Sequence, residues 1–510
     1  MIIEITKRFM LLPVSETARP KTLFLRQEGK ILVELRLRLA ARPDYIMPYD
    51  MAPFMGRSLE LSVEPEVDFT PEFADAPDDS GLYREKYRPA AHFSAARGWI
   101  NDPNGLIWHE GRYHLFFQHN PADWVWGNMH WGHAVSEDLV HWTELGETLR
   151  PDETGTMFSG SAVLDEKNLT GLGKDGRAPL LLYYTAAGGH GEICKNAPFT
   201  QRLAYSTDGG VTFVKYDRPI IENIAPGNRD PKVVFCDELD CYMMILYLTG
   251  HSFALFKSKD LLNWTMIQRF AIEDDDECPD LYPLSVEGER WWVITAAHDR
   301  YLIGRFEDGH FVTTRPAGRL HYGRESYAAQ TFFSAPEGRR VRIAWNRSPM
   351  PGMPFCGSMT TPHDMSLKRI DGELKLCAWP SPEFETLRGE KAEGRDRLPL
   401  TGRANDIQLV IPASGRRALR LFGLELTVDG DAGRVICPPA TEGGEETVMP
   451  VRRAEGTIRL RLIQDVHAVE VYAGEGEATM CLAHISDGLL NRVECDGADI
   501  TAWPLRDIHA

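Results

Sequence analysis

Three short acidic motifs recur along the middle of the chain: Trp-Ile-Asn-Asp-Pro-Asn-Gly at 99–105, Asn-Arg-Asp-Pro at 228–231 and Glu-Cys-Pro-Asp at 277–280. Each places a carboxylate (Asp102, Asp230 or Glu277) close ahead of a proline, where a run of strand-forming residues begins. Because proline fixes the backbone and stops a preceding helix, each acid is expected on a stiff corner at the mouth of a strand. Hydrolysis of a glycosidic bond needs one carboxylate as nucleophile and another as proton donor, so the three motifs predict a convergent acidic pocket of that kind.

The segments between the motifs repeat one pattern. Residues 134–142, 204–213 and 256–264 each read as a strand, a Ser-x-Asp turn and a short strand that ends on an aromatic residue, and 305–311 is a weaker fourth copy. Short strands in units of this length, with almost no helical periodicity, are typical of propeller blades. We count five blades. Their openings lie near Asn101, Phe158, Arg229, Pro279 and Tyr327.

Two regions flank the repeats. Residues 1–85 hold strand-like runs at 22–25, 31–39 and 58–63, followed by an acidic, proline-rich stretch at 64–80 that reads as a linker. After a charged segment at 387–397, further short strands without helices favour a β-sandwich. The predicted fold is therefore all-β: a small N-terminal β module (1–85), a five-bladed β-propeller that carries the catalytic motifs (86–385) and a C-terminal β-sandwich (386–510).

Composition excludes several classes of partner. The formal net charge of −18 argues against nucleic acid or an anionic membrane, and no apolar run is long enough for a membrane helix. The nine cysteines have no framework spacing, and the apolar run at 9–14 is short for a secretion signal. We therefore expect reduced thiols, a cytoplasmic location and a small carbohydrate as partner. A homo-oligomer remains an open option.

The motifs together resemble glycoside hydrolase family 32, the invertase, inulinase and levanase family. Besides the three acidic motifs, the chain carries matches in the family's order at 92–93, 117–121, 126–136 and 158–163. A single motif would be weak evidence, whereas this many in order across roughly residues 90–370 are specific.

The resemblance implies retaining hydrolysis of terminal β-fructofuranosides. No cofactor or metal is expected. Asp102 matches the nucleophile, Glu277 the general acid/base and Asp230 the stabiliser of the transition state. Retention requires the nucleophile and the acid/base to lie about 5–5.5 Å apart, with Glu277 protonated while Asp102 is ionised. The positions that match the family's substrate-binding residues are Asn101, Gln118, Trp126, Phe158, Ser159, Arg229, Tyr327 and Trp345.

Some features depart from the family pattern or allow two interpretations. His321 and Glu325 stand where the family tends to carry acids. We therefore expect them to reshape the leaving-group side of the pocket and to make sucrose a poor substrate. Titration of His321 is also expected to add a limb to the pH–activity profile near neutral pH. The run 274–276 could raise the pKa of Glu277 by like-charge repulsion, or could simply be a solvated turn. Cys278 is interpreted as a packing residue rather than a nucleophile.

The same residues leave alternative functions open. A fructosyltransferase would use the same covalent intermediate, and a propeller lectin would lack catalysis. Arabinoside- or xyloside-active propellers match the motifs less well. Six histidines follow strand alternation rather than a metal-ligand spacing: His109, His114, His119, His130, His133 and His141. The expected substrates are short fructo-oligosaccharides in preference to long levan or inulin, and the N-terminal module is expected to form a substrate-site rim or an oligomer contact.

Overall fold

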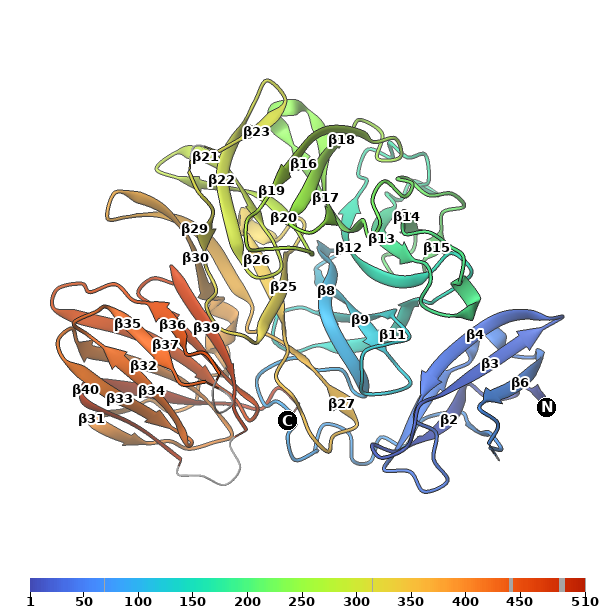
Figure 1. Cartoon of the computed structure of the whole chain (residues 1–510), viewed down its shortest axis with the longest axis horizontal. Helices are drawn as coiled ribbons and strands as arrows, with labels where there is room; N and C mark the ends of the chain where they lie inside the picture. Colours follow the sequence, from blue (N-terminus) through green and yellow to red (C-terminus); the bar gives the residue numbers. More distant parts are fainter. Residues whose placement is uncertain (68, 314, 440–443, 486–490, 510) are drawn as a thin grey trace.

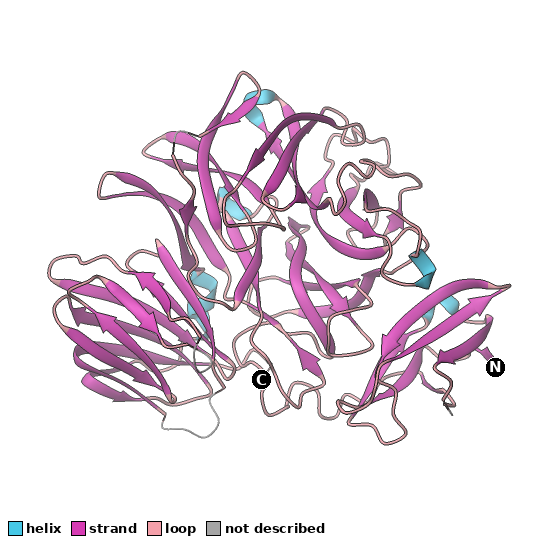
Figure 2. Cartoon of the chain, in the orientation of Figure 1, coloured by secondary structure: helices cyan, strands magenta, loops and turns pink. Residues whose placement is uncertain are grey.

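The computed structural model describes residues 1–67, 69–313, 315–439, 444–485 and 491–509. Within them the chain is almost entirely β-structure, which confirms the predicted all-β class (Figure 2). The helical segments among these residues are short 3-10 turns: η1 (Ala52–Phe54), η2 (Glu192–Cys194), η3 (Asp237–Leu239), η4 (Pro336–Gly338) and η5 (Pro382–Leu387).

Five antiparallel sheets follow one another along the middle of the chain. Their strands are, sheet by sheet, β8 (Gly98–His109), β9 (Arg112–Asn120), β10 (His130–Ser136) and β11 (Thr143–Leu149); β12 (Thr156–Leu164), β13 (Leu180–Ala187), β14 (Thr200–Ser206) and β15 (Val214–Lys215); β16 (Arg229–Cys236), β17 (Cys241–Thr249), β18 (Ser252–Ser258) and β19 (Thr265–Ala271); β20 (Asp280–Val286), β21 (Glu289–Thr295), β22 (Arg300–Glu307) and β23 (His310–Val312); β25 (Ser326–Thr331), β26 (Val341–Asn346), β29 (His363–Ile370) and β30 (Glu373–Pro380). Three two-residue strands extend these sheets: β24 (Gly318–Arg319), β27 (Phe355–Cys356) and β28 (Ser358–Met359).

The first strands of the five sheets form a closed ring. Each of β8, β12, β16 and β20 contacts the first strand of the next sheet, and β25 returns to contact β8 (Figure 1). The predicted opening residues lie in these strands or, for Pro279, immediately ahead of one. Side chains at equivalent positions of the five first strands are therefore brought to the same end of the ring.

The repeated Ser-x-Asp sequence forms the same turn in three sheets. The serine hydroxyl donates to the aspartate two residues later, at 3.1 Å for Ser136, 2.6 Å for Ser206 and 3.1 Å for Ser258. The same aspartates accept backbone N–H groups of the turn, as short polar side chains do in Asx turns. The turn explains why this sequence recurs between the third and fourth strands.

Residues ahead of the ring form two small sheets, ordered β1-β6-β3-β4 and β5-β2-β7. Their strands are β1 (Ile2–Glu4), β2 (Phe9–Val14), β3 (Lys21–Gln27), β4 (Lys30–Leu37), β5 (Tyr45–Asp50), β6 (Ser58–Glu64) and β7 (Glu72–Ala74). The stretch at 64–80 is not purely a linker, because β7 pairs with β2; Asp68 lies outside the described residues. The apolar run at 9–14 is a buried strand of this module.

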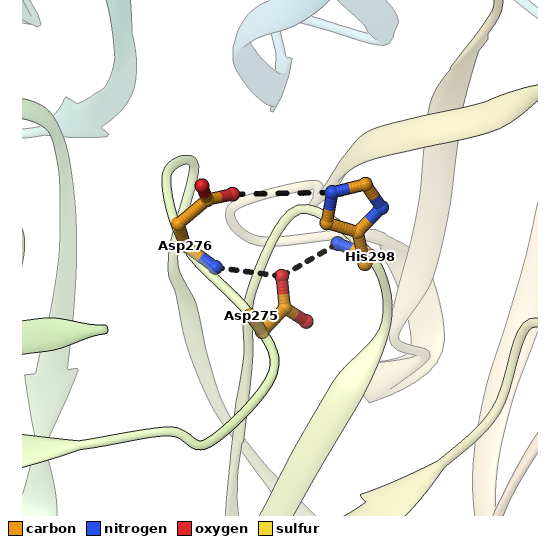
Figure 3. Close-up of side chains that lie close together, drawn as sticks. All are labelled: Asp275, Asp276 and His298. Carbon is orange, nitrogen blue, oxygen red and sulfur yellow. Dashed lines mark hydrogen bonds and ion pairs between the residues drawn. The ribbon is translucent and has the colours of Figure 1, made fainter. Parts of the chain in front are cut away.

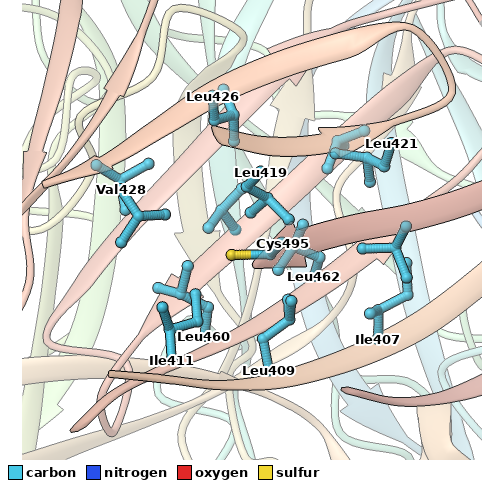
Figure 4. Close-up of a cluster of buried hydrophobic side chains, with 14 of the residues drawn as sticks. Ile407, Leu409, Ile411, Leu419, Leu421, Leu426, Val428, Leu460, Leu462 and Cys495 are labelled. Atoms are coloured by element: carbon cyan, nitrogen blue, oxygen red, sulfur yellow. The ribbon is translucent and has the colours of Figure 1, made fainter. Parts of the chain in front are cut away.

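The C-terminal region forms one hydrogen-bonded sheet whose strands wrap around a single apolar core. Its strands are β31 (Ala392–Pro399), β32 (Ala404–Pro412), β33 (Arg416–Leu421), β34 (Leu424–Asp429), β35 (Arg434–Cys437), β36 (Thr447–Pro450), β37 (Thr457–Gln464), β38 (Ala468–Ala473), β39 (Ala478–Ala483) and β40 (Arg492–Leu505). Leucines of β33 and β34 face apolar residues of β32 and β37 across this core (Figure 4). The run at 417–426, which reads as one strand in the sequence, is a hairpin that turns at Phe422 and Gly423.

A buried polar network joins the C-terminal sheet to the ring. His92 Nδ1 lies 2.7 Å from an Asp465 oxygen, and His92 Nε2 lies 3.3 Å from Glu470. Asp465 also accepts the backbone N–H groups of Ala90 and Ala91, each at 2.9 Å. Burial alone would lower the pKa of His92, but its bonds to the two carboxylates raise it to about 10, while the pKa of Asp465 is lowered.

This network predicts a pH-dependent stability. Since the unfolded histidine loses its proton near pH 6.5, the contribution of His92 is complete below that pH and is lost as the pH rises from about 6.5 to about 10. We expect Asp465→Asn to lower the free energy of unfolding by about 3 kcal/mol at pH 6, because it removes one partner of a buried ion pair. Calorimetric melting at a series of pH values should show a flatter profile above pH 6.5 for this variant than for the wild type.

A matched control is Asp499→Asn, which breaks an exposed ion pair with Arg395 on the same sheet. Its melting profile should follow the wild type. A loss of stability for Asp465→Asn that is the same at pH 6 and pH 9 would show that the His92 charge does not contribute.

All nine cysteines lie among the described residues and are free thiols.

In the described part of the chain, no helix has the length and apolarity to cross a membrane.

Candidate active site

Two of the three predicted acids, Asp102 and Asp230, lie where the first strands of the ring are irregular. Register shifts interrupt β8 between Ile100 and Pro103, β12 between Phe158 and Gly160, and β16 between Arg229 and Lys232. Such bulges bend a strand and redirect its side chains, and they are frequent at active sites. In β12 the bulge depends on Gly160, since a Cβ there would lie 1.9 Å from the Tyr183 carbonyl oxygen. Asp102, Ser159 and Asp230 all lie within these bulges.

Backbone strain accompanies two of the three acids. Asp230 has φ of 63°, Glu277 of 47° and Cys278 of 38°, a left-handed region that residues other than glycine rarely adopt. The Asp230 N–H donates to the Thr185 hydroxyl at 3.0 Å, and the Cys278 N–H donates to an Asp230 oxygen at 3.0 Å, so these conformations are locked. Strain that the surroundings enforce is typical of functional positions.

Asp102 is held by a chain of hydrogen bonds from predicted site residues. The Gln118 amide donates to the Ser159 hydroxyl at 3.0 Å, and that hydroxyl donates to an Asp102 oxygen at 2.5 Å. The Asn101 amide also bonds Asp102, while its oxygen accepts the Trp99 indole N–H at 2.9 Å. The orientation of the Asp102 carboxylate is therefore fixed before any substrate arrives.

Glu277 is held by a cation and a phenol. Tyr327 donates its hydroxyl to one Glu277 oxygen at 2.6 Å, and the Arg229 guanidinium donates to the other. Arg229 also lies 3.7 Å from Asp230 and stacks over the Tyr247 ring at 4.5 Å. Asp102 and Asp230 line one small cavity, and Cys278 connects them, with its sulfur 3.4 Å from the first carboxylate and 3.5 Å from the second. The ring thus brings the three acids together.

The acids differ in the direction in which their surroundings shift the pKa. Burial raises the pKa of Asp102, and it raises that of Asp230 to about 7 despite the opposing charge of Arg229. Burial also acts to raise the pKa of Glu277, but the Tyr327 hydroxyl and the Arg229 guanidinium outweigh it, so that pKa is lowered. In the unliganded protein these two directions are the reverse of those expected for Glu277 as the acid with the raised pKa and Asp102 as the carboxylate. The reason is that Arg229 and Tyr327 both donate hydrogen bonds to the Glu277 carboxylate.

The acidic run before Glu277 is neither a source of raised pKa for that residue nor a wholly solvated turn. Asp275 is buried and accepts the backbone N–H groups of Asp276, His298 and Arg300 at 2.8–2.9 Å. Asp276 lies 3.9 Å from the His298 ring (Figure 3). Oxygen and nitrogen atoms of Asp275, Asp276 and His298 lie close enough together to hold a cation. The three backbone N–H groups that Asp275 accepts tie this cluster to the loop that carries Glu277.

Aromatic side chains form one wall beside Asp102. Phe158, next to Ser159, contacts Trp126 with ring centroids 6.1 Å apart. Its ring also contacts His190 at 4.9 Å and Phe199 at 5.8 Å. Trp126 is 49% exposed, which leaves it available to a ligand. Exposed aromatic rings of this kind suit the apolar faces of sugars.

Trp345 belongs to a second aromatic group, on the side of Glu277. Its ring lies 5.6 Å from that of Trp99 and 6.2 Å from that of Tyr327. All eight predicted substrate-binding residues therefore lie in contact with an acid or with another member of the set. Among the described residues, the sequence interpretation missed His190, Phe199, Tyr247, His298 and Thr185. No spacing in the sequence marks these residues; Thr185, for example, follows two tyrosines in the largely apolar run of β13.

The prediction that His321 adds a limb to the pH–activity profile near neutral pH is wrong. Its side chain is 5% exposed and lies against the C-terminal sheet, with Nδ1 3.1 Å from the Thr479 hydroxyl. Burial lowers its pKa to about 3, so it cannot add a limb near neutral pH. Glu325 is half-buried and its pKa is raised by burial, partly offset by Arg347 and Arg324. The sequence could not reveal this because the residues that cover His321 come from a strand about 160 positions away.

Cys278 provides a test of how the acids are held. Burial and the nearby carboxylates of Asp102 and Asp230 raise the pKa of its thiol well above the usual range, so the sulfur is a weak neutral donor. The bond to Asp230 that matters comes from the backbone N–H. We expect Cys278→Ala to lower kcat/KM by less than about fivefold. A loss above about a hundredfold would show that the thiol itself takes part in the reaction.

Comparison with known proteins decides the family. The model for the glycosyl hydrolases family 32 N-terminal domain matches residues 92–380. The chain is 32% identical to a levanase of Bacillus subtilis over 465 residues, which cover 79% of this chain and 67% of the levanase. This chain belongs to glycoside hydrolase family 32. It is therefore a glycoside hydrolase, as the sequence analysis predicted.

Further relatives agree. The chain is 30% identical to an extracellular exo-inulinase of Aspergillus awamori, with 78% of this chain and 89% of the inulinase covered. The crystal structure of an exo-inulinase from the same organism superimposes with a TM-score of 0.75 at 26% identity, covering 84% of this chain and 99% of the other. The N-terminal module lies ahead of the segment that the family model matches.

Proposed function

We propose that this family 32 hydrolase is a retaining exo-β-fructosidase that releases terminal β-fructofuranosyl residues from fructo-oligosaccharides, fructans or sucrose. The observation that carries the proposal is the convergence of Asp102 from β8, Asp230 from β16 and Glu277 from the loop ahead of β20, with Asp102 braced by Ser159. The exo-inulinase and levanase relatives support the substrate class. The ring of five sheets is proposed to be a five-bladed propeller, followed by a β-sandwich that carries no reacting group.

In the proposed reaction Asp102 attacks the anomeric carbon and forms an ester with the fructosyl unit, while Glu277 gives a proton to the leaving oxygen. Water then attacks the same carbon, Glu277 takes its proton, and Asp102 is released as carboxylate. Asp230 bonds fructosyl hydroxyls, with contacts that strengthen in the transition state. The balance is one water consumed for each glycosidic bond broken.

Protonation of Glu277 must change when substrate binds. A sugar that takes up the hydrogen bonds of Arg229 and Tyr327 removes the two contacts that lower the pKa of Glu277. Burial by the same sugar disfavours the carboxylate, so the pKa of Glu277 rises in the complex. The unliganded protein is, on this view, a resting state in which the acid is held ionised.

A substrate panel tests the proposal. Sucrose, kestose, nystose, inulin and levan are supplied at equal terminal-fructosyl concentration, and the sugars are resolved by chromatography. We expect fructose released one unit at a time, with faster hydrolysis of the short oligosaccharides. New longer oligosaccharides in place of free fructose would indicate a transferase. Absence of turnover on every β-fructoside would overturn the proposed function.

A further inference from the structure

A large cleft lies between the N-terminal module and the ring. Its volume is about 1030 Å³, and its walls are formed by β3 and β4 on one side and by the segments 123–129 and 189–195 on the other. Sites for drug-sized ligands occupy roughly 300–1,000 Å³, so this cleft has room for several sugar units. None of the eight site residues predicted from the sequence, apart from Trp126, lines it.

The cleft is preformed because the module is fixed to the ring. Trp124, from a loop of the ring, is part of the apolar core of the module. The Asn128 amide pairs with the backbone of Arg36, accepting its N–H at 2.8 Å and donating to its carbonyl at 2.9 Å. Across the cleft, Glu34 accepts the backbone N–H of Ile193 at 2.8 Å. A ligand would therefore meet an ordered surface, which lowers the entropic cost of binding.

The cleft begins one aromatic layer away from the reacting acids. Trp126 and His190 line it, and both rings contact Phe158. Phe158 precedes Ser159, the residue that holds Asp102. A chain whose last sugar lies against Asp102 can therefore extend past Trp126 into the cleft.

The lining suits a neutral polyhydroxylated ligand. Its charges are of both signs and partly paired: Arg38 lies 3.8 Å from Asp123, and Lys195 lies 3.0 Å from Glu192. A phosphate site would concentrate cations, and this cleft does not. Charged donors and acceptors beside an exposed tryptophan are the groups that bind sugar hydroxyls and sugar faces.

We propose that the cleft binds the leaving-group chain of β-fructo-oligosaccharides, so that the N-terminal module sets the preference for chain length. This inference rests on the proposed function and assigns the module a substrate-binding role.

Binding can be tested apart from turnover in the full-length Asp102→Asn protein by calorimetric titration with sucrose, kestose and nystose. We expect nystose to bind about tenfold more tightly than sucrose. Arg36→Ala or Glu192→Ala, added to this protein, should reduce that ratio to about threefold or less. The matched control is Arg42→Ala, which removes an exposed arginine of the same module outside the cleft and should leave the ratio unchanged.

Two outcomes separate this inference from the proposed function. In the first, nystose binds more tightly than sucrose in a manner that depends on Arg36 while the wild type hydrolyses no β-fructoside. That result would overturn the proposed reaction but support the binding role of the cleft. If the wild type hydrolyses fructosides while binding does not depend on chain length, or the ratio survives both cleft substitutions, the cleft assignment is overturned alone.

Discussion

Asp102→Asn is expected to lower kcat on sucrose or kestose by about 10⁴-fold, the scale seen when a nucleophile is removed from a covalent mechanism. That loss corresponds to roughly 5 kcal/mol of transition-state stabilisation. The change keeps the shape of the side chain and its acceptor for the Ser159 hydroxyl, but an amide oxygen cannot form the fructosyl ester. Initial rates with chromatographic detection of fructose measure the effect.

Loss of activity through unfolding is distinguished by the melting temperature. Because burial raises the pKa of Asp102, its charge is unfavourable in the folded protein, and a neutral amide should leave the melting temperature unchanged or higher. Asp175→Asn, in an exposed turn, is the control and should retain wild-type rates. An Asp102→Asn protein with more than about a tenth of the wild-type rate would remove Asp102 from the role of nucleophile.

Glu277→Gln is expected to lower kcat/KM on sucrose by about 10²–10⁴-fold, the usual contribution of general acid–base catalysis. The amide can still accept from Tyr327 and lie beside Arg229, so the geometry of the site is kept. It cannot protonate the leaving oxygen. With a fructoside whose leaving group needs no proton, such as a nitrophenolate, the variant should show a much smaller loss in the rate of forming the fructosyl-enzyme.

Asp276→Asn is the matched control, because it neutralises the adjacent acid, which contacts His298 rather than the reacting groups. We expect it to change kcat/KM by less than about threefold, as for a half-exposed ion pair. Equal losses on sucrose and on the activated fructoside would contradict the acid role of Glu277. If Asp276→Asn lowered kcat/KM as much as Glu277→Gln does, the assignment of the proton transfer to Glu277 would be wrong.

The parts of the site that the sequence predicts are those encoded locally. Asp102, Asp230 and Glu277 stand beside prolines that fix the chain at the mouth of a strand, and the Ser-x-Asp repeats mark equivalent turns, so their convergence follows from counting units. Gln118 and Ser159 form one chain of hydrogen bonds that ends on Asp102. Both belong to the predicted substrate-binding set.

The rest depends on contacts between distant segments. Thr185 and Tyr247 lie in apolar strands of neighbouring sheets, and no spacing marks them as partners of Asp230 and Arg229. The lowered pKa of Glu277 depends on Tyr327, fifty positions away, whereas the sequence shows only the adjacent acids. His321 stands where the family tends to carry an acid, yet strand β39 buries it.

Trapping the covalent bond between Asp102 and the fructosyl unit tests the proposed mechanism. Glu277→Gln protein is mixed with an activated β-fructofuranoside, quenched in acid within one turnover, digested and examined by mass spectrometry. We predict one anhydrofructosyl unit on the peptide that contains Asp102, and none when Asp102→Asn is added. An adduct on any other residue, or full turnover with no adduct and with inversion at the anomeric carbon, would contradict the covalent role of Asp102.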